Sequence, residues 1–391
     1  MSNQIHGPAE AEINRIERTY RRLKAEGRDV LKLFSGNPND EGFLFPSGIL
    51  EEAYQRYFRR QEYRPHSKGL LPARRAIARY YEEQGAVLDP EDILLTAGTS
   101  ESFFYLFSLL ARPGDNILTP NPAYPLFDYI AQLAGVELRP YPLREGGHWN
   151  IDLQEMRRLT TEKTRAIVLI SPHNPTGAVP SADEIGEVVR WANEKSIPII
   201  CDEVFCEFFY GAGKFQRPMA VAKPKLCFTL NGISKMFALP ALKLGWIAVT
   251  GEPSQVAAAV DRLETTADTF LSCHIPIQQA LPDLFEKGRG FAKEYVAEVG
   301  RRRRLALDLL LPSSLRLIEP VGGFYLMAEV PQASGDEEDF IVSLMEETGV
   351  FVHPGFFFDY EKGVHAVVSY LVRPDRLQHG LTELIRFVTR R

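Results

Sequence analysis

The middle of the chain alternates short apolar runs with amphipathic helical patterns, and this alternation restricts the possible folds more than any other feature. In residues 99–115, Phe103, Phe104, Phe107 and Leu110 recur at helical spacing. Strand-length runs rich in β-branched residues occupy 92–98, 116–120, 166–172, 197–205, 226–232 and 245–251. Strands that alternate with helices predict an α/β fold, with a mainly parallel sheet covered by helices on both faces.

A chain of 391 residues is too long for one compact core, so two domains are expected. From about residue 285 a long charged helical pattern leads into mixed strands and helices, which is an α+β pattern. The sequence therefore predicts a large α/β domain at 46–284. The smaller domain comprises 285–391 together with the N-terminal arm, residues 1–45, which is too short to fold alone.

Two charged segments are expected to be helical. Residues 181–196 open with Ser181 as a plausible N-cap and Glu184 three positions later, the pattern of a capping box. The basic run Arg301–Arg304 lies in a helical pattern next to acidic residues, and we expect it to form a solvated helix face.

Composition excludes several classes of function. The chain is 45% hydrophobic and 25% charged, as in ordinary soluble proteins, and its net charge of −6 favours neither nucleic acid nor an anionic membrane as a partner. No stretch has the length of a membrane span, and the first residues lack the apolar core of a signal peptide. The four cysteines match no zinc spacing, so we expect no metal site, reduced thiols and a cytoplasmic protein.

Polar residues follow several of the predicted strands. Ligands of open parallel sheets bind beyond the carboxyl ends of the strands, where this chain places Gly98-Thr99-Ser100, Tyr124, Asn174, Asp202 and Ser234-Lys235. Each has an ordinary structural explanation, such as a helix cap, a packing ring or a turn residue. Together they supply a phosphate cradle, an aromatic plate, an amide donor, an acid and an amine, which are the groups that pyridoxal 5'-phosphate requires.

The order and spacing of these motifs resemble class I/II aminotransferases, which are pyridoxal-phosphate-dependent enzymes of fold type I. The resemblance covers nearly the whole chain and rests on "FSGNPND", "EYRPHSKGLLPARRAIARYY", "AGTSESF", "PNPAYP", "SPHNPTG", "CDEVF", "NGISK" and "HPGFFF". It implies a large domain with a mostly parallel seven-stranded sheet, and a smaller α+β domain.

The resemblance also implies roles for single residues. Lys235 would hold the cofactor as a Schiff base and then act as general base, and Asp202 would pair with the pyridine nitrogen. Asn174 would donate to the phenolic oxygen and also contact the substrate. Tyr124 would stack on the ring.

Other implied roles concern the phosphate and the substrate. Gly98, Thr99 and Ser100 would cradle the phosphate, with Ser234 as a further contact. Tyr63 would reach the phosphate in the neighbouring subunit, which implies a homodimer. Gly36 would lie against the substrate carboxylate.

Three positions depart from the family pattern. Phe205 stands where the family usually has a tyrosine that binds the phenolic oxygen, so we expect the Schiff-base proton to be held more tightly. Lys243 replaces a phosphate-binding arginine and cannot form a bidentate fork. Val367 replaces the arginine that clamps the substrate carboxylate, and Arg373 is the nearest substitute in sequence.

The predicted function is transfer of an amino group between an amino acid and a 2-oxo acid by a ping-pong mechanism. The departures leave other reactions of the same cofactor open, namely those of a lyase, a cyclising synthase or an oxidase acting on an amino acid. A non-catalytic module that binds a nucleotide or cofactor is the remaining possibility. Such a module would have no yellow colour and would not depend on Lys235.

Overall fold

The predicted alternation of strands and helices forms a mixed sheet of eight strands, as seen in a computed structural model that describes residues 13–333 and 335–391. The strands are β2 (Ile93–Thr96), β3 (Asn116–Asn121), β4 (Glu137–Arg144), β5 (Asn150–Ile151), β6 (Thr164–Ile170), β7 (Ile199–Asp202), β8 (Leu226–Gly232) and β9 (Gly245–Gly251). Their order in the sheet is β2-β9-β8-β7-β6-β3-β4-β5. The pairs β4-β3, β3-β6, β6-β7 and β7-β8 are parallel, whereas β9 runs antiparallel to both its neighbours and β5 is antiparallel to β4. The sheet thus has the seven strands that the family resemblance implied and, in addition, the two-residue edge strand β5.

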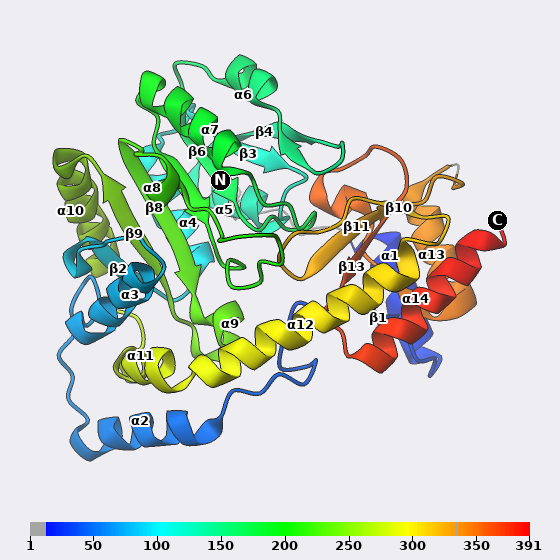
Figure 1. Ribbon diagram of the computed structural model, residues 1–391, viewed down its shortest axis with the longest axis horizontal. Helices are drawn as coiled ribbons and strands as arrows, with labels where there is room; N and C mark the ends of the chain where they lie inside the picture. Colours follow the sequence, from blue (N-terminus) through cyan, green and yellow to red (C-terminus); the bar gives the residue numbers. More distant parts are fainter. Residues whose placement is uncertain (1–12, 334) are drawn as a thin grey trace, which may run out of the picture.

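Helices cover both faces of this sheet (Figure 1). The helices of this part are α3 (Leu71–Glu83), α4 (Thr99–Leu110), α5 (Leu126–Ala134), α6 (Leu153–Leu159), α7 (Ala182–Lys195), α8 (Pro218–Val221), α9 (Ile233–Met236), α10 (Pro253–Phe270) and α11 (Ile275–Lys287). The helix α2 (Ser47–Arg60) packs against α11 instead and lies apart from the sheet in Figure 1. Phe103 of α4 and Leu263 of α10 share a core with Val168 of β6 on one face. Neighbouring strand residues point to opposite faces, so Leu169 packs instead with Val188 of α7.

The remaining elements form a second part of the molecule, to the right in Figure 1. Its strands are β1 (Leu31–Lys32), β10 (Arg316–Leu317), β11 (Tyr325–Glu329), β12 (Val350–Phe351) and β13 (His365–Ser369), and its helices are α1 (Arg15–Ala25), α12 (Arg289–Leu310), α13 (Glu337–Thr348) and α14 (Pro374–Thr389). The sheets are β10-β11-β13, antiparallel, and β1-β12, parallel. Three short 3-10 helices complete the described elements: η1 (Pro90–Asp92), η2 (Pro240–Leu242) and η3 (Gly355–Phe358). The N-terminal strand β1 thus pairs with a strand more than three hundred residues away.

The long helix α12 joins the two parts, and it corrects one expectation about charge. Arg302 and Arg303 are buried, although the basic run was expected to be a solvated face. Arg302 donates to the carbonyl oxygens of Glu41 and Leu371, and Arg303 donates to the carbonyl oxygen of Pro320. Only Arg301 and Arg304 of the run are exposed. Arg302 and Arg303 lie on the side of α12 that packs against the rest of the protein, so their side chains extend over buried surface to reach polar partners.

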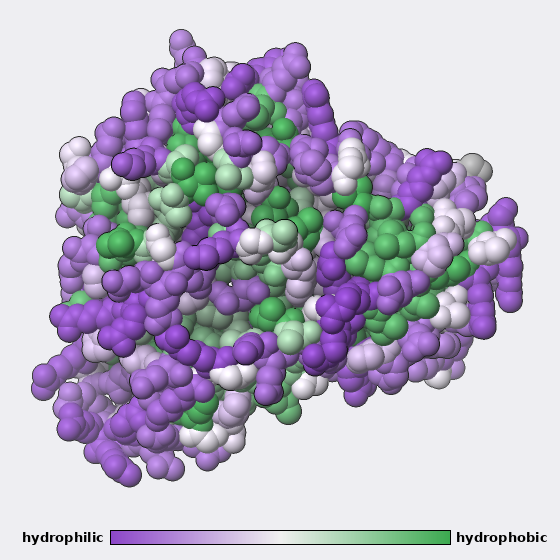
Figure 2. Space-filling model, viewed as in Figure 1, coloured by the Kyte–Doolittle hydropathy of each residue, from purple (hydrophilic) through white to green (hydrophobic). Residues whose placement is uncertain are grey.

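The face of the molecule in Figure 2 is mostly hydrophilic, with hydrophobic residues gathered in patches, the largest over the second part. Among the described residues, no helix combines the length and the apolar character needed to cross a membrane.

Candidate active site

A cavity of about 170 Å³ opens at the carboxyl ends of the parallel strands, where the sequence predicted the ligand site. It is lined by nine of the predicted residues: Gly98, Thr99, Ser100, Tyr124, Asn174, Asp202, Phe205, Ser234 and Lys235. They lie at the carboxyl ends of five different strands of the sheet or in the segments that follow them. The topology therefore gathers at one place residues that span more than 130 positions of sequence.

Lys235 projects from a single helical turn, α9, that directly follows β8. The buried side chains of Ile233 and Met236 anchor this turn, so that Ser234 and Lys235 face the cavity. The Lys235 Nζ atom donates a hydrogen bond to the Gly36 carbonyl oxygen at 2.5 Å. Burial, and secondarily the positive charge of Lys243, lower the pKa of Lys235 to about 8. A usable fraction of this amine is therefore neutral near physiological pH.

Asp202 is the last residue of β7 and is buried. Its Oδ1 atom accepts a hydrogen bond from the Val204 amide at 3.0 Å. Burial raises the pKa of Asp202 to about 7, and the carboxylate of Glu203 adds to the rise while the Val204 amide opposes it. Among the described residues, Asp202 has no basic side chain in ion-pair distance. A carboxylate in this setting is stabilised by a cation placed in the cavity.

The helix α4 begins at the edge of the cavity with Gly98 as its N-cap, at φ 150°, a conformation open to glycine. No side chain caps this helix, so its first amide groups point toward the cavity without an intrahelical partner. The strand β9 passes very close, since a Cβ atom at Gly245 would lie 3.0 Å from the Gly98 Cα atom. Free amide groups at the positive end of a helix form a ready site for a phosphate.

Asn174 and Phe205 also line the cavity. The Asn174 Oδ1 atom is buried without a hydrogen-bond partner among the described residues. The ring of Phe205 packs edge-on against Phe324, with centroids 4.9 Å apart, and its centroid is 6.0 Å from Lys235 Nζ. Phe205 therefore presents a hydrocarbon edge where a tyrosine would present a hydroxyl.

The other predicted site residues do not line the cavity. Gly36 touches it only through its bond to Lys235. Lys243 is exposed at the end of η2 with φ 46°, and acts on Lys235 through its charge. Tyr63 is 71% exposed, and Arg373 is an exposed residue at the start of α14 whose amide donates to Glu41.

Val367 is fully buried in β13, opposite Met327 of β11 and in an apolar cluster with Phe358. The position where the family pattern has a carboxylate-binding arginine is thus part of a hydrocarbon core. A charged side chain at this position would be costly, because nothing in that cluster can pair with it.

Sequence reasoning missed one polar residue of the cavity, Tyr325 of β11. A Cβ atom added at Gly36 would lie 2.3 Å from the Tyr325 hydroxyl and 3.9 Å from Lys235 Nζ, so the three groups are close together. Burial raises the pKa of Tyr325, which keeps the phenol a hydrogen-bond donor. The motif "GGFY" was visible, but the sequence pattern could not show that β11 brings its tyrosine to the large sheet.

The cavity fits pyridoxal phosphate in its chemistry. It holds a buried acid with no cationic partner, an unpaired amide oxygen, an uncapped helix terminus and an amine with a lowered pKa. In the described part of the chain, no group of three or more His, Cys, Asp or Glu side chains is placed to hold a metal ion.

The fold is that of the fold type I aminotransferases, and comparison with known proteins agrees. The model of the family described as "Aminotransferase class I and II" matches residues 28–369. The chain belongs to this family, as its motifs indicated, and it is an aminotransferase.

Individual relatives cover nearly the whole chain. The glutamate-pyruvate aminotransferase AlaA of Haemophilus influenzae is 28% identical over 98% of this chain and 95% of its own length. The alanine aminotransferase of Mycobacterium tuberculosis is 30% identical over 93% of this chain and 84% of its own length. Among solved structures, the alanine aminotransferase of Pyrococcus furiosus superposes with a TM-score of 0.91, at 25% identity and 98% coverage of both chains. The predicted fold class is thereby confirmed.

Proposed function

We propose that the cavity binds pyridoxal 5'-phosphate and uses it to move an amino group from an amino acid to a 2-oxo acid. The observation that carries this proposal is the convergence of Lys235, Asp202 and the free start of α4 on one cavity. Lys235 would bind the cofactor covalently, and Gly98, Thr99 and Ser100 would hold its phosphate, assisted by Ser234 and the charge of Lys243. When bound, the cofactor supplies an electron sink for the carbon that loses its proton.

The protein's own groups then have defined tasks. Asp202, placed next to the ring nitrogen, would keep that nitrogen protonated, and the positive charge would in turn lower the pKa of the Asp202 carboxyl. Asn174 would turn its amide nitrogen toward the phenolic oxygen, and Tyr124 would stack on the ring. Lys235 is neutral in part because of its lowered pKa. It would take the proton from the substrate α-carbon and deliver it to the C4′ carbon of the cofactor.

This function can be tested by a single half-reaction. The purified protein should be yellow. When an amino acid is added without any oxo acid, it should release one equivalent of 2-oxo acid per subunit, because the amino group stays on the enzyme. The variant Lys235→Ala should lose both the colour and this turnover. Continuous release of ammonia would instead indicate a lyase or an oxidase, and a colourless wild-type protein would contradict cofactor binding.

The substrate carboxylate needs a partner other than an arginine at position 367. We infer that Tyr325 and Asn174 hold it next to Gly36, since both side chains line the cavity and Tyr325 lies against Gly36. Arg373, the nearest arginine in sequence, is exposed and does not line the cavity.

Two substitutions separate these assignments. Tyr325→Phe should raise the KM for the amino acid by about tenfold with a smaller change in kcat, because a hydrogen bond to a charged group is lost. Arg373→Ala should leave the KM unchanged. If Arg373→Ala raises the KM and Tyr325→Phe does not, Arg373 is the carboxylate ligand.

We propose a division into a large domain at 46–284 and a small domain made of 285–391 and the N-terminal arm, 1–45. Its support is that β1 and α1 share one core with β12 and α13. The first twelve residues of the arm lie outside the described residues. A cytoplasmic location is also proposed, supported by four cysteines that are all free, three of them buried.

A further inference from the structure

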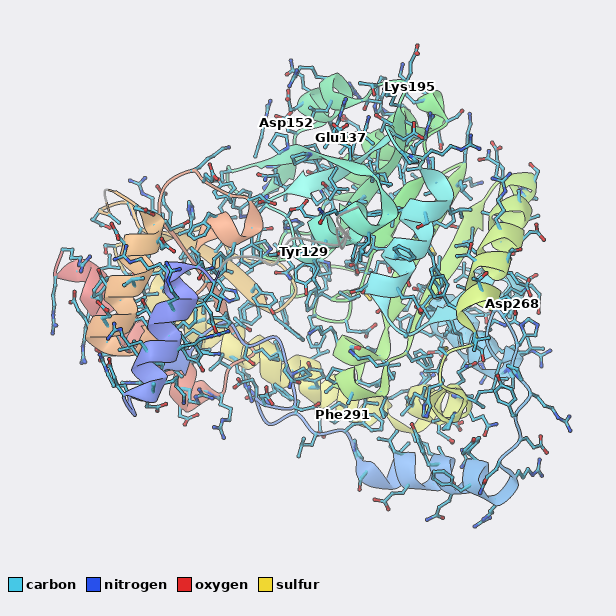
Figure 3. All side chains as sticks on the ribbon, turned by 180° about the vertical axis from the view of Figure 1, so that it is seen from behind. Tyr129, Glu137, Asp152, Lys195, Asp268 and Phe291 are labelled. Atoms are coloured by element: carbon cyan, nitrogen blue, oxygen red, sulfur yellow. The ribbon has the colours of Figure 1, made fainter. Side chains whose placement is uncertain are left out.

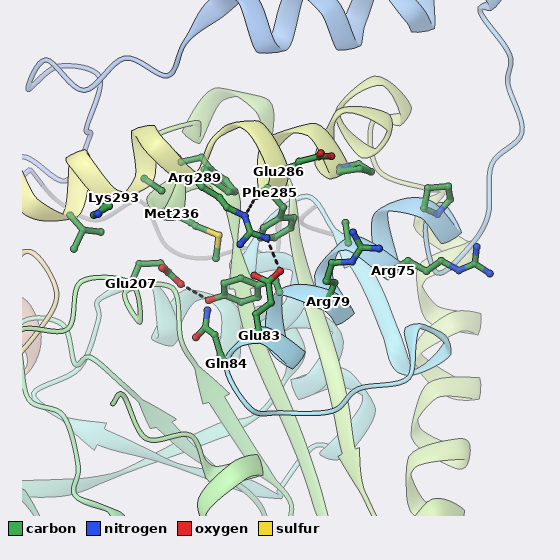
Figure 4. A pocket seen from close by; sticks show the side chains of 17 residues that line it. Arg75, Arg79, Glu83, Gln84, Glu207, Met236, Phe285, Glu286, Arg289 and Lys293 are labelled. Atoms are coloured by element: carbon green, nitrogen blue, oxygen red, sulfur yellow. Dashed lines mark hydrogen bonds and ion pairs between the residues drawn. The ribbon is translucent and has the colours of Figure 1, made fainter. Parts of the chain in front are cut away.

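A second and larger cavity, of about 710 Å³, lies between α3, α11 and α12 (Figure 4). We call it the α3–α12 groove. None of its lining residues belongs to the active-site cavity. Its volume lies within the range of about 300–1,000 Å³ that is typical of small-molecule sites.

The floor of the groove is apolar and largely aromatic. Phe285 lies in contact with Phe237 and Tyr80, at ring-centroid distances of 5.5 and 5.2 Å. Met236 continues this surface. Such a floor suits a flat or branched hydrocarbon body rather than a fully hydrated ion.

Positive side chains form two sides of the groove. Arg75 and Arg79 stand one turn apart on α3, and Arg289 and Lys293 stand one turn apart on α12, so that each pair shares a helix face. Among the described residues, only Arg289 of these four has an ion-pair partner, which is Glu83. Four cations therefore line a concave surface of a protein whose net charge is −6, and three of the four have no ion-pair partner among the described residues.

Acidic residues are present too, and two of the three are already engaged. Glu83 is held by Arg289 at 2.6 Å, and Glu207 accepts a hydrogen bond from the Tyr80 hydroxyl. The third, Glu286, is exposed on α11. The charged groups of the groove that remain unpaired are thus mainly the N–H donors of its arginine and lysine side chains.

The Arg289–Glu83 pair crosses the middle of the groove from α12 to α3 (Figure 4). Its side chains are 60% and 43% exposed. An ion pair this exposed contributes little to stability, so another carboxylate can replace that of Glu83 at small cost. Arg289 offers such a carboxylate a bidentate fork, with Arg79 nearby as a second donor.

We propose that the α3–α12 groove binds a small organic carboxylate with an apolar or aromatic body, at a site separate from the active site. The hydrocarbon lies on Phe285, Phe237 and Met236, and the carboxylate displaces Glu83 from Arg289. Met236, at the base of the groove, is the residue directly after Lys235.

The proposal is tested with 4-phenylbutyrate, which has neither an amino nor an oxo group, by titration calorimetry on the cofactor-loaded full-length protein. Binding should weaken about tenfold or more in Arg79→Gln/Arg289→Gln, because the charge-assisted interactions with the carboxylate are lost. It should tighten severalfold in Glu83→Gln, which frees Arg289. The neutral analogue 4-phenylbutan-1-ol should bind far more weakly than the acid.

The matched control is Lys163→Gln/Arg190→Gln, which removes two exposed cations remote from the groove and should bind the probe as the wild type does. Equal binding to the wild type and to Arg79→Gln/Arg289→Gln would overturn the proposal. So would displacement of the probe by an amino-acid substrate together with no effect of Glu83→Gln, because the probe would then occupy the active site. These outcomes concern binding alone and stay distinct from failure of the transamination test.

Discussion

Lys235 and Lys243 are eight residues apart and have unequal tasks. Lys235 is enclosed in the cavity, whereas Lys243 is exposed and influences it through its charge. A like charge destabilises the protonated form of an amine, so Lys243 assists burial in lowering the pKa of Lys235.

Replacing Lys243 should therefore change the titration of Lys235. In Lys243→Gln, removal of the like charge should raise the pKa of Lys235 from about 8 toward its ordinary value, and less neutral amine should be present near pH 7.5. The pKa can be read from an NMR titration of the methylated Lys235 side chain in the cofactor-free protein. Lys243→Arg keeps the charge and serves as control. An equal titration in Lys243→Gln and wild type would show that burial alone sets this pKa.

The departures at Phe205 and Val367 show how far single residues can be interpreted from sequence. Their identities were visible, but only the packing shows that both belong to hydrocarbon surroundings, Phe205 with Phe324 and Val367 with Met327. Tyr325 packs against both clusters, and its ring centroid is 6.3 Å from that of Phe205. Tyr325, which comes from another strand, is the hydroxyl that reaches the cavity.

At the scale of elements, the sequence pattern predicted those strands whose residues are buried on both faces. The run 226–232 became β8 with unchanged bounds, because an apolar β-branched run between helices has few other arrangements. The strand β4 was not predicted, since its sequence "ELRPYPLR" contains two prolines and no apolar run. The two prolines are tolerated because β4 pairs with the short edge strand β5 at only two residues, so few backbone hydrogen bonds are needed on that side.

The capping box that opens α7 was predicted correctly, because it depends on local contacts alone. The Ser181 hydroxyl accepts from the Glu184 amide at 3.2 Å, and the Ser181 amide donates to the Glu184 carboxylate at 2.9 Å. Glu184 also accepts from the Ile151 amide of β5, which no local pattern indicates.

These contacts predict a graded loss of stability. Ser181→Ala should lower the free energy of unfolding by about 1 kcal/mol, the usual effect of losing an N-cap. Glu184→Ala should cost more, because it also removes the hydrogen bond to β5. Urea unfolding measures both changes, with Ser254→Ala, an exposed serine in α10, as control. Equal effects of Ser181→Ala and Ser254→Ala would show that the N-cap does not contribute to the free energy of unfolding.

At the scale of the whole molecule, several large apolar side chains are exposed, including Tyr63, Phe270 and Leu271. In the rear view, Tyr129 of α5, also exposed, and Asp268, two residues before Phe270, are both visible (Figure 3). Exposed apolar groups on this scale typically mark a protein interface. We propose that they form the interface of a homodimer, in which Tyr63 reaches the partner's cofactor site.

The dimer makes a further prediction. Leu271→Asp should raise the dimer dissociation constant by about tenfold or more, because a buried contact would be replaced by an unpaired charge. Analytical ultracentrifugation over a range of concentrations measures this change. Val87→Asp, also at an exposed apolar residue, should leave the association unchanged. A monomeric wild-type protein, or equal effects of the two variants, would contradict the proposed interface.

The long helix α12 has a mechanical consequence. Its 22 unbroken residues extend about 33 Å, and Arg302 and Arg303 fasten it to loops of the second part. Over this length, a tilt of the helix by about 5° about its first turn would shift its last turn by about 3 Å. Lys235 and Asp202 belong to the part with the large sheet, whereas Tyr325 belongs to the part that Arg302 and Arg303 bind to α12. A tilt of α12 would therefore change the distance between the Tyr325 hydroxyl and Lys235.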